Sequence, residues 1–212
     1  MYVAIEGVIG VGKTTLARLI HPSLQAVLLM EVFEENPFLS DFYSDRERYA
    51  FQTQIFFLLS RYHQQHKAIP EALQAGRMII SDYTFDKDSL FARINLKGDE
   101  LTMYYKVHEA LAEKIPEPDL VVYLRADTDV LMQRIAHRDR PYERSMERAY
   151  IDELNHAYDD FFTNSASQLK VLTLDTNDLN IVSQPQDLTL VENRIHQELR
   201  LAPYQESLPL TS

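Results

Sequence analysis

The residues with the clearest chemical signature lie at positions 7 to 14, where three of the chain's five glycines precede a lysine and a threonine. The segment Gly7-Val8-Ile9-Gly10-Val11-Gly12-Lys13-Thr14 fits the pattern G-x-x-x-x-G-K-[ST] and follows an apolar run that predicts a strand. Glycines let such a loop turn tightly with its N–H groups pointing inward, and the helix that follows adds the positive end of its dipole. The segment therefore predicts a site for the phosphates of a nucleotide.

The residues at the end of this loop predict how a nucleoside triphosphate would be held. Lys13 can reach the β- and γ-phosphates, and the hydroxyl of Thr14 can bind Mg²⁺. The loop does not identify the acceptor of a phosphoryl group, because ATPases, GTPases and kinases share it. The residues expected to contact the nucleotide here are Gly7, Gly10, Val11, Gly12, Lys13, Thr14 and Thr15.

Two acidic residues, Glu31 and Asp82, each directly follow a predicted strand. Because open α/β sheets bind ligands at the carboxyl ends of their strands, we expect both carboxylates near the phosphate loop. Glu31 could take the proton of an attacking hydroxyl, or it could be one solvated acid of an acidic stretch. Asp82 could hold the magnesium ion or its waters, or it could cap a helix. We predict a catalytic role for both residues.

The densest basic segment of the chain contains Arg134, Arg138 and Arg140, with Glu143 close by. Three arginines at this spacing after a predicted helix are typical of a flexible lid that closes on transferring phosphates and neutralises their charge. The alternative is a solvated helix face, which is common for surface arginines. Since the chain has a net charge of −11, this concentration of cations favours the lid. We predict that all three arginines contact the nucleotide and that Arg138 is catalytic.

A predicted helix over residues 44–66 carries many aromatic side chains, most of which we expect in the core. Gln52 stands among them as a polar exception. An amide can donate and accept hydrogen bonds at once, so Gln52 could recognise the edge of a nucleobase while a neighbouring ring stacks on the base.

The elements that must position these residues alternate between short apolar runs and longer stretches of helical periodicity. Five strands interleaved with helices predict an α/β fold with a parallel sheet covered on both faces. The expected strands are 2–6, 26–30, 77–81, 120–124 and 170–174, and the longer helices are 44–66, 100–114, 127–136 and 146–163. Helix ends or strand starts are expected at Pro70, Pro116, Pro118 and Pro185.

Length and composition limit the class of protein. The 212 residues, 45% hydrophobic and 25% charged, fit a single domain over 1–201 followed by a tail over 202–212 that we expect to be flexible. We find no apolar run long enough to span a membrane and no secretion signal, so we expect a cytoplasmic location and no membrane partner. The charge of −11 argues against a nucleic-acid polymer as partner, and the absence of cysteine excludes disulfides.

Together these motifs resemble those of the deoxynucleoside kinases, and most closely the bacterial deoxyguanosine and deoxyadenosine kinases. The likeness extends over nearly the whole chain. It rests on AIEGVIGVGKTTLA, EVFEENPFLSDFY, YAFQTQIFFLLSRY, SDYTFDKDSLFARINL and QRIAHRDRPYE, in that order. The resemblance implies a P-loop kinase fold, a homodimer through the long helices, and transfer of the γ-phosphate of ATP to the 5′-hydroxyl of a deoxynucleoside in nucleotide salvage, with ATP and Mg²⁺ as cofactors.

The resemblance also implies roles for single residues. Glu31 is similar to the catalytic base of the family, and Gln52 to its base reader. Tyr43 and Glu143 are similar to the residues that bind the sugar 3′-hydroxyl. Phe91 resembles the ring that stacks on the base, and Asp88 a second polar contact to it. The acceptor site implied in this way consists of Glu31, Phe33, Tyr43, Gln52, Asp82, Lys87, Asp88, Phe91 and Glu143.

Two positions depart from the family pattern. Val32 stands where most members have proline, which should change the stiffness of the loop more than its chemistry. Tyr83 follows Asp82 where the usual pattern has an arginine, and tyrosine cannot supply that positive charge. The charge could come from Lys87 or Arg93. The pattern D-Y-x-x-x-K resembles the bacterial deoxyguanosine kinases, which favours a purine acceptor.

Two other functions stay open at this point. A nucleoside-monophosphate kinase such as a thymidylate kinase shares the loop, the lid and the sheet, but it needs a cationic pocket for the acceptor's phosphate, for which Arg61 and Arg93 are the candidates. A regulatory switch that only binds a nucleoside triphosphate would leave Gln52, Glu31 and the arginine segment unexplained.

Overall fold

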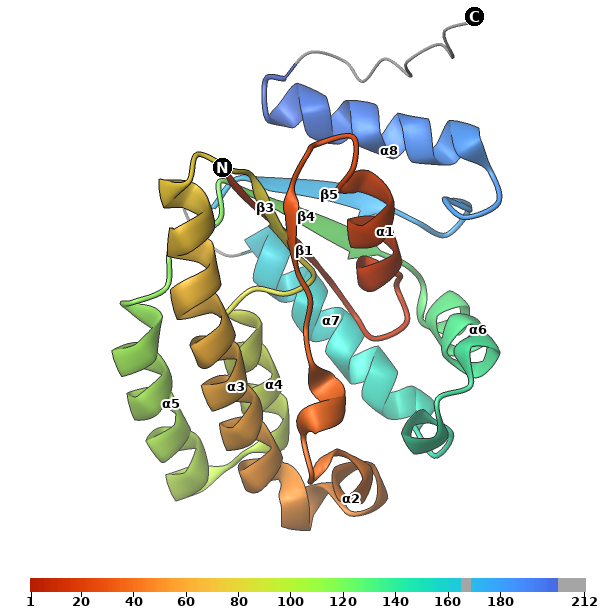
Figure 1. The fold of residues 1–212 in the computed structure, drawn as a ribbon. Coiled ribbons are helices and arrows are strands. Elements are labelled where there is room, and N and C mark those ends of the chain that lie inside the picture. The colour runs from red at the N-terminus through yellow and green to blue at the C-terminus, as the bar shows by residue number, and fades with distance from the viewer. Residues whose placement is uncertain (165–168, 202–212) are drawn as a thin grey trace, which may run out of the picture.

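The computed structural model describes residues 1–164 and 169–201, and within them five parallel strands form one sheet (Figure 1). All five predicted strands are confirmed, and they lie in the order β2-β3-β1-β4-β5. Every residue of β1 is buried, as expected for a central strand covered on both faces. The strands are β1 (Tyr2–Gly7), β2 (Val27–Leu29), β3 (Ile79–Ser81), β4 (Leu120–Arg125) and β5 (Val171–Asp175).

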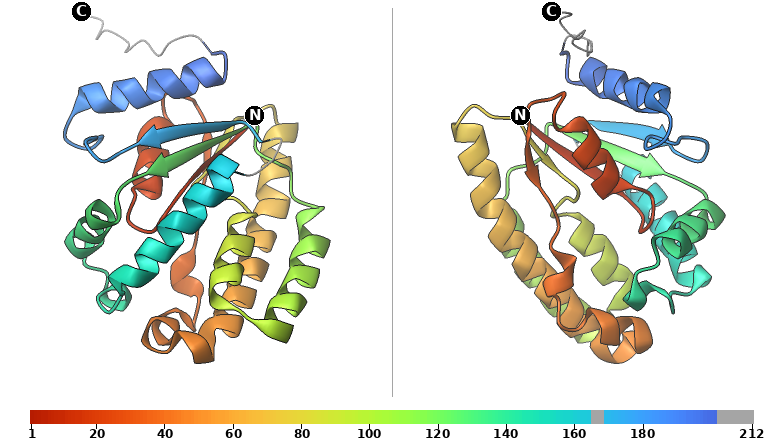
Figure 2. Two further views of the ribbon diagram at one scale, coloured as in Figure 1. Left: turned by 180° about the vertical axis from the view of Figure 1, so that it is seen from behind. Right: turned by 45° about the vertical axis from the view of Figure 1, so that its right-hand side comes forward.

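Helices cover both faces of this sheet. Helix α8 lies along one face, and α3, α4, α5 and α7 lie below the other in Figures 1 and 2. Helices α2 and α6 lie beyond the carboxyl ends of the strands. The phosphate loop and the segments that carry Glu31 and Asp82 begin at the same edge of the sheet. The helices are α1 (Lys13–Ile20), α2 (Leu39–Ser44), α3 (Arg46–Gln74), α4 (Lys87–Asn95), α5 (Gly98–Ala112), α6 (Thr128–Arg138), α7 (Arg148–Asn164) and α8 (Pro185–Glu198).

The helices differ from the sequence predictions at Pro70, at Pro185 and in three helices that were not predicted. The prediction of a helix end at Pro70 is wrong, because α3 continues through Pro70 to Gln74. A proline inside a helix removes one N–H bond, but here its neighbours Ile69 and Ala72 are buried against β1 and β3, and that packing outweighs the loss. Helices α2, α4 and α8 were not predicted, and the expectation at Pro185 is wrong because this proline begins α8. The tail over 202–212 lies outside the described residues.

Within the described parts of the chain, no helix combines the length and the apolar character that a membrane span requires.

The turn out of β1 depends on Gly7. Its φ is +144°, and a Cβ placed there would lie 2.4 Å from the carbonyl oxygen of Leu124, its partner on β4. Gly76 also has a positive φ, of +68°, but a Cβ there would meet no described atom within 4 Å.

We expect Gly7→Ala to lower the free energy of unfolding by at least about 3 kcal/mol, because backbone strain and a clash with a main-chain atom act together. Gly76→Ala is the matched control, and it should lose only about 1 kcal/mol from the strained φ. Urea unfolding of both variants measures the difference. Equal losses would show that the contact with β4 does not require glycine at position 7.

Candidate active site

A cavity of about 1060 Å³ lies at the carboxyl ends of the strands. One side consists of the phosphate loop and residues 176–183 after β5, and the other consists of side chains from α3 and α4. The volume is at the upper end of the range for small-molecule sites, about 300–1,000 Å³, which leaves room for a nucleotide and a second ligand. The predicted site residues that line it are Gly10, Val11, Gly12, Lys13, Thr14, Thr15, Glu31, Phe33, Tyr43, Asp82, Lys87, Phe91, Arg134, Arg138, Arg140 and Glu143.

Lys13 lies over the phosphate loop at the start of α1. Its Nζ donates to the carbonyl oxygens of Gly7 at 2.6 Å and Val8 at 3.2 Å. Burial, with the nearby charge of Lys87, lowers the pKa of Lys13 to about 8. The ammonium is therefore a cation held against neutral carbonyls, which the oxygens of a phosphate can replace as stronger acceptors.

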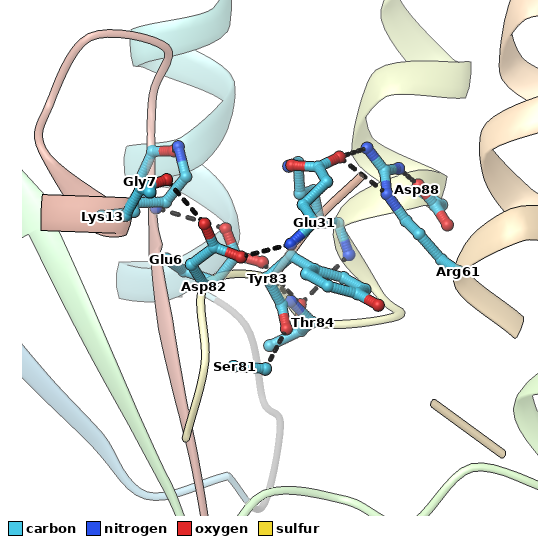
Figure 3. Close-up of polar contacts among 12 residues, drawn as sticks. Glu6, Gly7, Lys13, Glu31, Arg61, Ser81, Asp82, Tyr83, Thr84 and Asp88 are labelled. Carbon is cyan, nitrogen blue, oxygen red and sulfur yellow. Dashed lines mark hydrogen bonds and ion pairs between the residues drawn. The ribbon is translucent and has the colours of Figure 1, made fainter. Parts of the chain in front are cut away.

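Asp82 connects the phosphate loop to the segment after β2. One carboxylate oxygen accepts from the hydroxyl of Thr14 at 2.6 Å. The other accepts from the backbone N–H of Glu31 at 2.8 Å, as Figure 3 shows. A hydroxyl and a carboxylate side by side are the hard oxygen ligands that Mg²⁺ prefers. The pair Thr14 and Asp82 therefore fits the predicted metal site.

Glu31 is held by two cations from two different helices. Arg61 of α3 donates from Nε to one carboxylate oxygen at 3.0 Å, and Lys87 of α4 donates to the other at 2.9 Å. The side chain of Glu31 is only 14% exposed. Burial alone would raise the pKa of Glu31, but the charges of Arg61 and Lys87 outweigh it and hold the pKa well below its usual range. Glu31 is thus an ionised carboxylate at the cavity wall.

The structure shows which residue supplies the positive charge that the family pattern places at the position of Tyr83. Lys87 bonds to Glu31, whereas Arg93 is exposed on α4 and does not line the cavity. Tyr83 itself is fully buried and donates from its hydroxyl to Gln64 at 2.6 Å. The local positive charge therefore comes from Lys87 together with Arg61.

The structure does not support Gln52 as the base reader. Gln52 is exposed, and the amide that lines the cavity is Gln54, which is buried. Two residues along a helix differ by about 200°, so the two amides point to opposite sides of α3. Gln54 lies seven residues before Arg61, which is two turns and hence the same face. That spacing is the sequence signal that could have identified it.

Asp88 also lies elsewhere than predicted. It is fully buried, pairs with Arg61, and is not among the residues that line the cavity. Arg61 therefore lies between two carboxylates, Glu31 and Asp88 (Figure 3). This position makes Asp88 a support for Arg61 rather than a wall of the cavity.

The three arginines of the predicted lid take two different positions. Arg134 donates to the carbonyl of Val11 at 3.3 Å and to the hydroxyl of Thr176 at 3.0 Å, so it ties the phosphate loop to the loop after β5. Arg138 and Arg140 instead meet at buried Glu143, with closest N–O distances of 2.6 and 3.6 Å. That this segment moves as a lid stays a prediction.

Aromatic rings form part of the wall beside these arginines. The guanidinium of Arg140 lies 4.1 Å from the ring centroid of Phe33. Tyr43 stacks on Tyr142 with centroids 6.2 Å apart, and burial raises the pKa of Tyr43 well above its usual value. The phenol of Tyr43 is therefore a neutral group that can donate a hydrogen bond into the cavity.

Comparison with known proteins identifies the family. The model of the family described as "Deoxynucleoside kinase" matches residues 3–199. The chain belongs to the deoxynucleoside kinases. It is 33% identical over 189 residues to a deoxyguanosine kinase of Bacillus subtilis, covering 88% of this chain and 91% of that protein. It is 31% identical over 205 residues to a deoxyadenosine/deoxycytidine kinase of the same organism, covering 92% and 90%.

Solved structures agree with this assignment. A deoxyadenosine kinase from M. mycoides superposes with a TM-score of 0.80 at 25% identity, covering 93% of this chain and 99% of that chain. The kinase is therefore an ATP-dependent phosphotransferase that acts on deoxynucleosides, and the predicted P-loop kinase fold is confirmed.

The pKa of Lys13 predicts a pH dependence. Lys13 is charged below about pH 8 and neutral above it, and a neutral amine cannot balance phosphate charge. We expect kcat/KM for ATP to fall about tenfold per pH unit above this value, since kcat/KM reports the free enzyme. Circular dichroism at each pH serves as the control for folding. A profile that stays flat up to about pH 10, the ordinary range of lysine, would contradict this assignment.

Proposed function

We propose that this kinase transfers the γ-phosphoryl group of ATP to the 5′-hydroxyl of a purine deoxynucleoside, in nucleotide salvage. The observation that carries the proposal is the position of Glu31. Its carboxylate lies at the wall of one cavity, connected through Asp82 to the phosphate loop and held by Arg61 and Lys87. A base in this position can accept the proton of a hydroxyl that faces the γ-phosphate.

Thr14 and Asp82 would hold Mg²⁺ in this reaction. When bound, the ion would neutralise charge on the phosphates. Lys13 binds the β- and γ-phosphates, and Arg138 and Arg140 supply further positive charge from the segment after α6. Arg134 keeps the phosphate loop and the loop after β5 at a fixed separation.

The acceptor's sugar and base would contact the other side of the cavity. Tyr43 and Glu143 are proposed to bind the 3′-hydroxyl, as the family resemblance implies. Gln54 offers an amide to the edge of the base, and Phe91 offers a ring to its face. The purine preference is supported by the deoxyguanosine kinase of Bacillus subtilis and by a deoxyadenosine kinase of Dictyostelium discoideum, also 33% identical.

The charges of the site favour a nucleoside over a nucleoside monophosphate as acceptor. Of the two cations considered for an acceptor phosphate, Arg61 is engaged by Glu31 and Asp88, and Arg93 is exposed away from the cavity. A phosphate beside Arg61 would also face the negative charge of Glu31.

We also propose that the kinase forms a homodimer through its long helices. Exposed apolar side chains on α3 and α5 support this, namely Leu59, Met103 and Val107. The single domain over 1–201 and the cytoplasmic location stay predictions.

ADP formation from ATP over a panel of deoxynucleosides, ribonucleosides and their monophosphates tests the function. We expect deoxyguanosine or deoxyadenosine to give the highest rate. A clear preference for deoxycytidine or thymidine would contradict the purine assignment. Activity with monophosphates alone would indicate a nucleoside-monophosphate kinase, and ATP hydrolysis that no nucleoside changes would indicate a switch.

Replacing each glutamine of α3 tests which one reads the base. Gln54→Ala should cost about 1 to 3 kcal/mol in kcat/KM for the best deoxynucleoside and reduce the difference between bases, because the site loses its polar partner. Gln52→Ala is the matched control, since Gln52 is exposed on the same helix, and it should leave both quantities unchanged. The reverse result would return the role to Gln52.

A further inference from the structure

Glu6 is a buried carboxylate that the reaction described above does not use. It is the penultimate residue of β1, its exposure is 0%, and its partner on β4 is Tyr123. Among the described residues no basic side chain forms an ion pair with it. A carboxylate in such a place is unfavourable unless its oxygens find donors, and an apolar residue of similar size is often at least as stable. Stability alone therefore does not account for Glu6.

Four donors from three parts of the chain satisfy Glu6. One oxygen accepts from the backbone N–H of Thr84 at 2.6 Å and from its hydroxyl at 2.9 Å. The other oxygen accepts from the N–H of Gly7 at 3.2 Å and from the hydroxyl of Tyr158 at 3.3 Å. Glu6 thus joins the start of the phosphate loop to the segment after β3 (Figure 3). Through Tyr158 it is also joined to α7.

Thr84 is the centre of the segment that carries the proposed catalytic groups. Asp82, two residues before it, bonds to Thr14 and to the N–H of Glu31. Lys87, three residues after it, bonds to the carboxylate of Glu31. The hydroxyl of Thr84 also accepts from the N–H of Lys87 at 3.3 Å and so caps the first turn of α4, where Asp86 makes no side-chain cap.

We propose that Glu6 is a positioning residue for phosphoryl transfer, which fixes segment 82–87 against the phosphate loop. This inference rests on the proposed function, because it takes the roles of Glu31, Asp82 and Lys87 from there. Glu6 bonds to Thr84, which lies between Asp82 and Lys87, and so holds the segment that carries both residues. Glu6 also accepts from the N–H of Gly7 and so holds the loop that receives the phosphates. The separation between the acceptor hydroxyl and the phosphate then depends on one buried carboxylate.

Glu6→Gln tests the proposal, because it keeps the shape but turns one acceptor oxygen into a donor that faces other N–H or O–H donors. We expect kcat to fall about tenfold to a hundredfold while KM for ATP changes little, because the loss lies in positioning for transfer rather than in binding of the nucleotide. Tyr158→Phe is the matched control, since it removes one donor to Glu6 and leaves the Thr84 bonds in place. Its kcat should stay within about twofold of the wild type.

Thr84→Val removes the hydroxyl bond from the other side and decides the case if Glu6→Gln fails to fold by circular dichroism. Thr84→Val should lower kcat at least about fivefold, and Thr84→Ser, which keeps the hydroxyl, should restore it. The double variant of Glu6→Gln and Thr84→Val should lose no more of kcat than the worse single variant, because both substitutions act on one contact. Losses that multiply, or kcat within about twofold of wild type in folded Glu6→Gln or in Thr84→Val, would overturn the proposal. A wild-type enzyme without activity on any deoxynucleoside would instead contradict the proposed function.

Discussion

The ion pairs that hold Glu31 are the constraint on which the rest of the site depends. A buried carboxylate requires partners, and its two cations come from the middle of α3 and the first turn of α4. Arg61 can reach Glu31 only because α3 packs beside β2 and β3, and Asp88 keeps its guanidinium in place. Lys87 reaches it only because the segment after β3 turns back toward the phosphate loop. The acceptor side and the phosphate side of the cavity therefore form together.

The same ion pairs set the chemistry that Glu31 can perform. With its pKa held well below the usual range, Glu31 is ionised at any physiological pH but is a weak base. A weak base suits phosphoryl transfer through a loose transition state, in which the hydroxyl proton leaves late. In the proposed reaction, Glu31 would both accept this late proton and hold the hydroxyl in line with the phosphate. Arg61 and Lys87 also reduce the repulsion between Glu31 and the phosphates, because both cations pair with its carboxylate.

The sequence predicts the sheet and the phosphate loop well, because both rest on local patterns. Apolar runs gave all five strands, and the glycines, Lys13 and Thr14 define the loop by spacing alone. What failed depends on how elements turn in space. Composition does not show which face of α3 meets the cavity, so Gln52 was predicted where the structure has Gln54, and composition does not decide between Lys87 and Arg93. The helix through Pro70 depends on burial against the sheet, which no local signal reveals.

The central claim is that the carboxylate of Glu31 takes part in the chemical step, and the single-turnover rate of Glu31→Gln tests it most directly. Glutamine keeps the size and removes the base and its charge. The variant should fold, bind ATP and the deoxynucleoside with nearly native affinity, and transfer phosphate about 10²-fold more slowly, at the low end of general base catalysis as expected for late proton removal. A variant that keeps most of its chemical rate would contradict the account and leave Glu31 as a structural partner of Arg61 and Lys87.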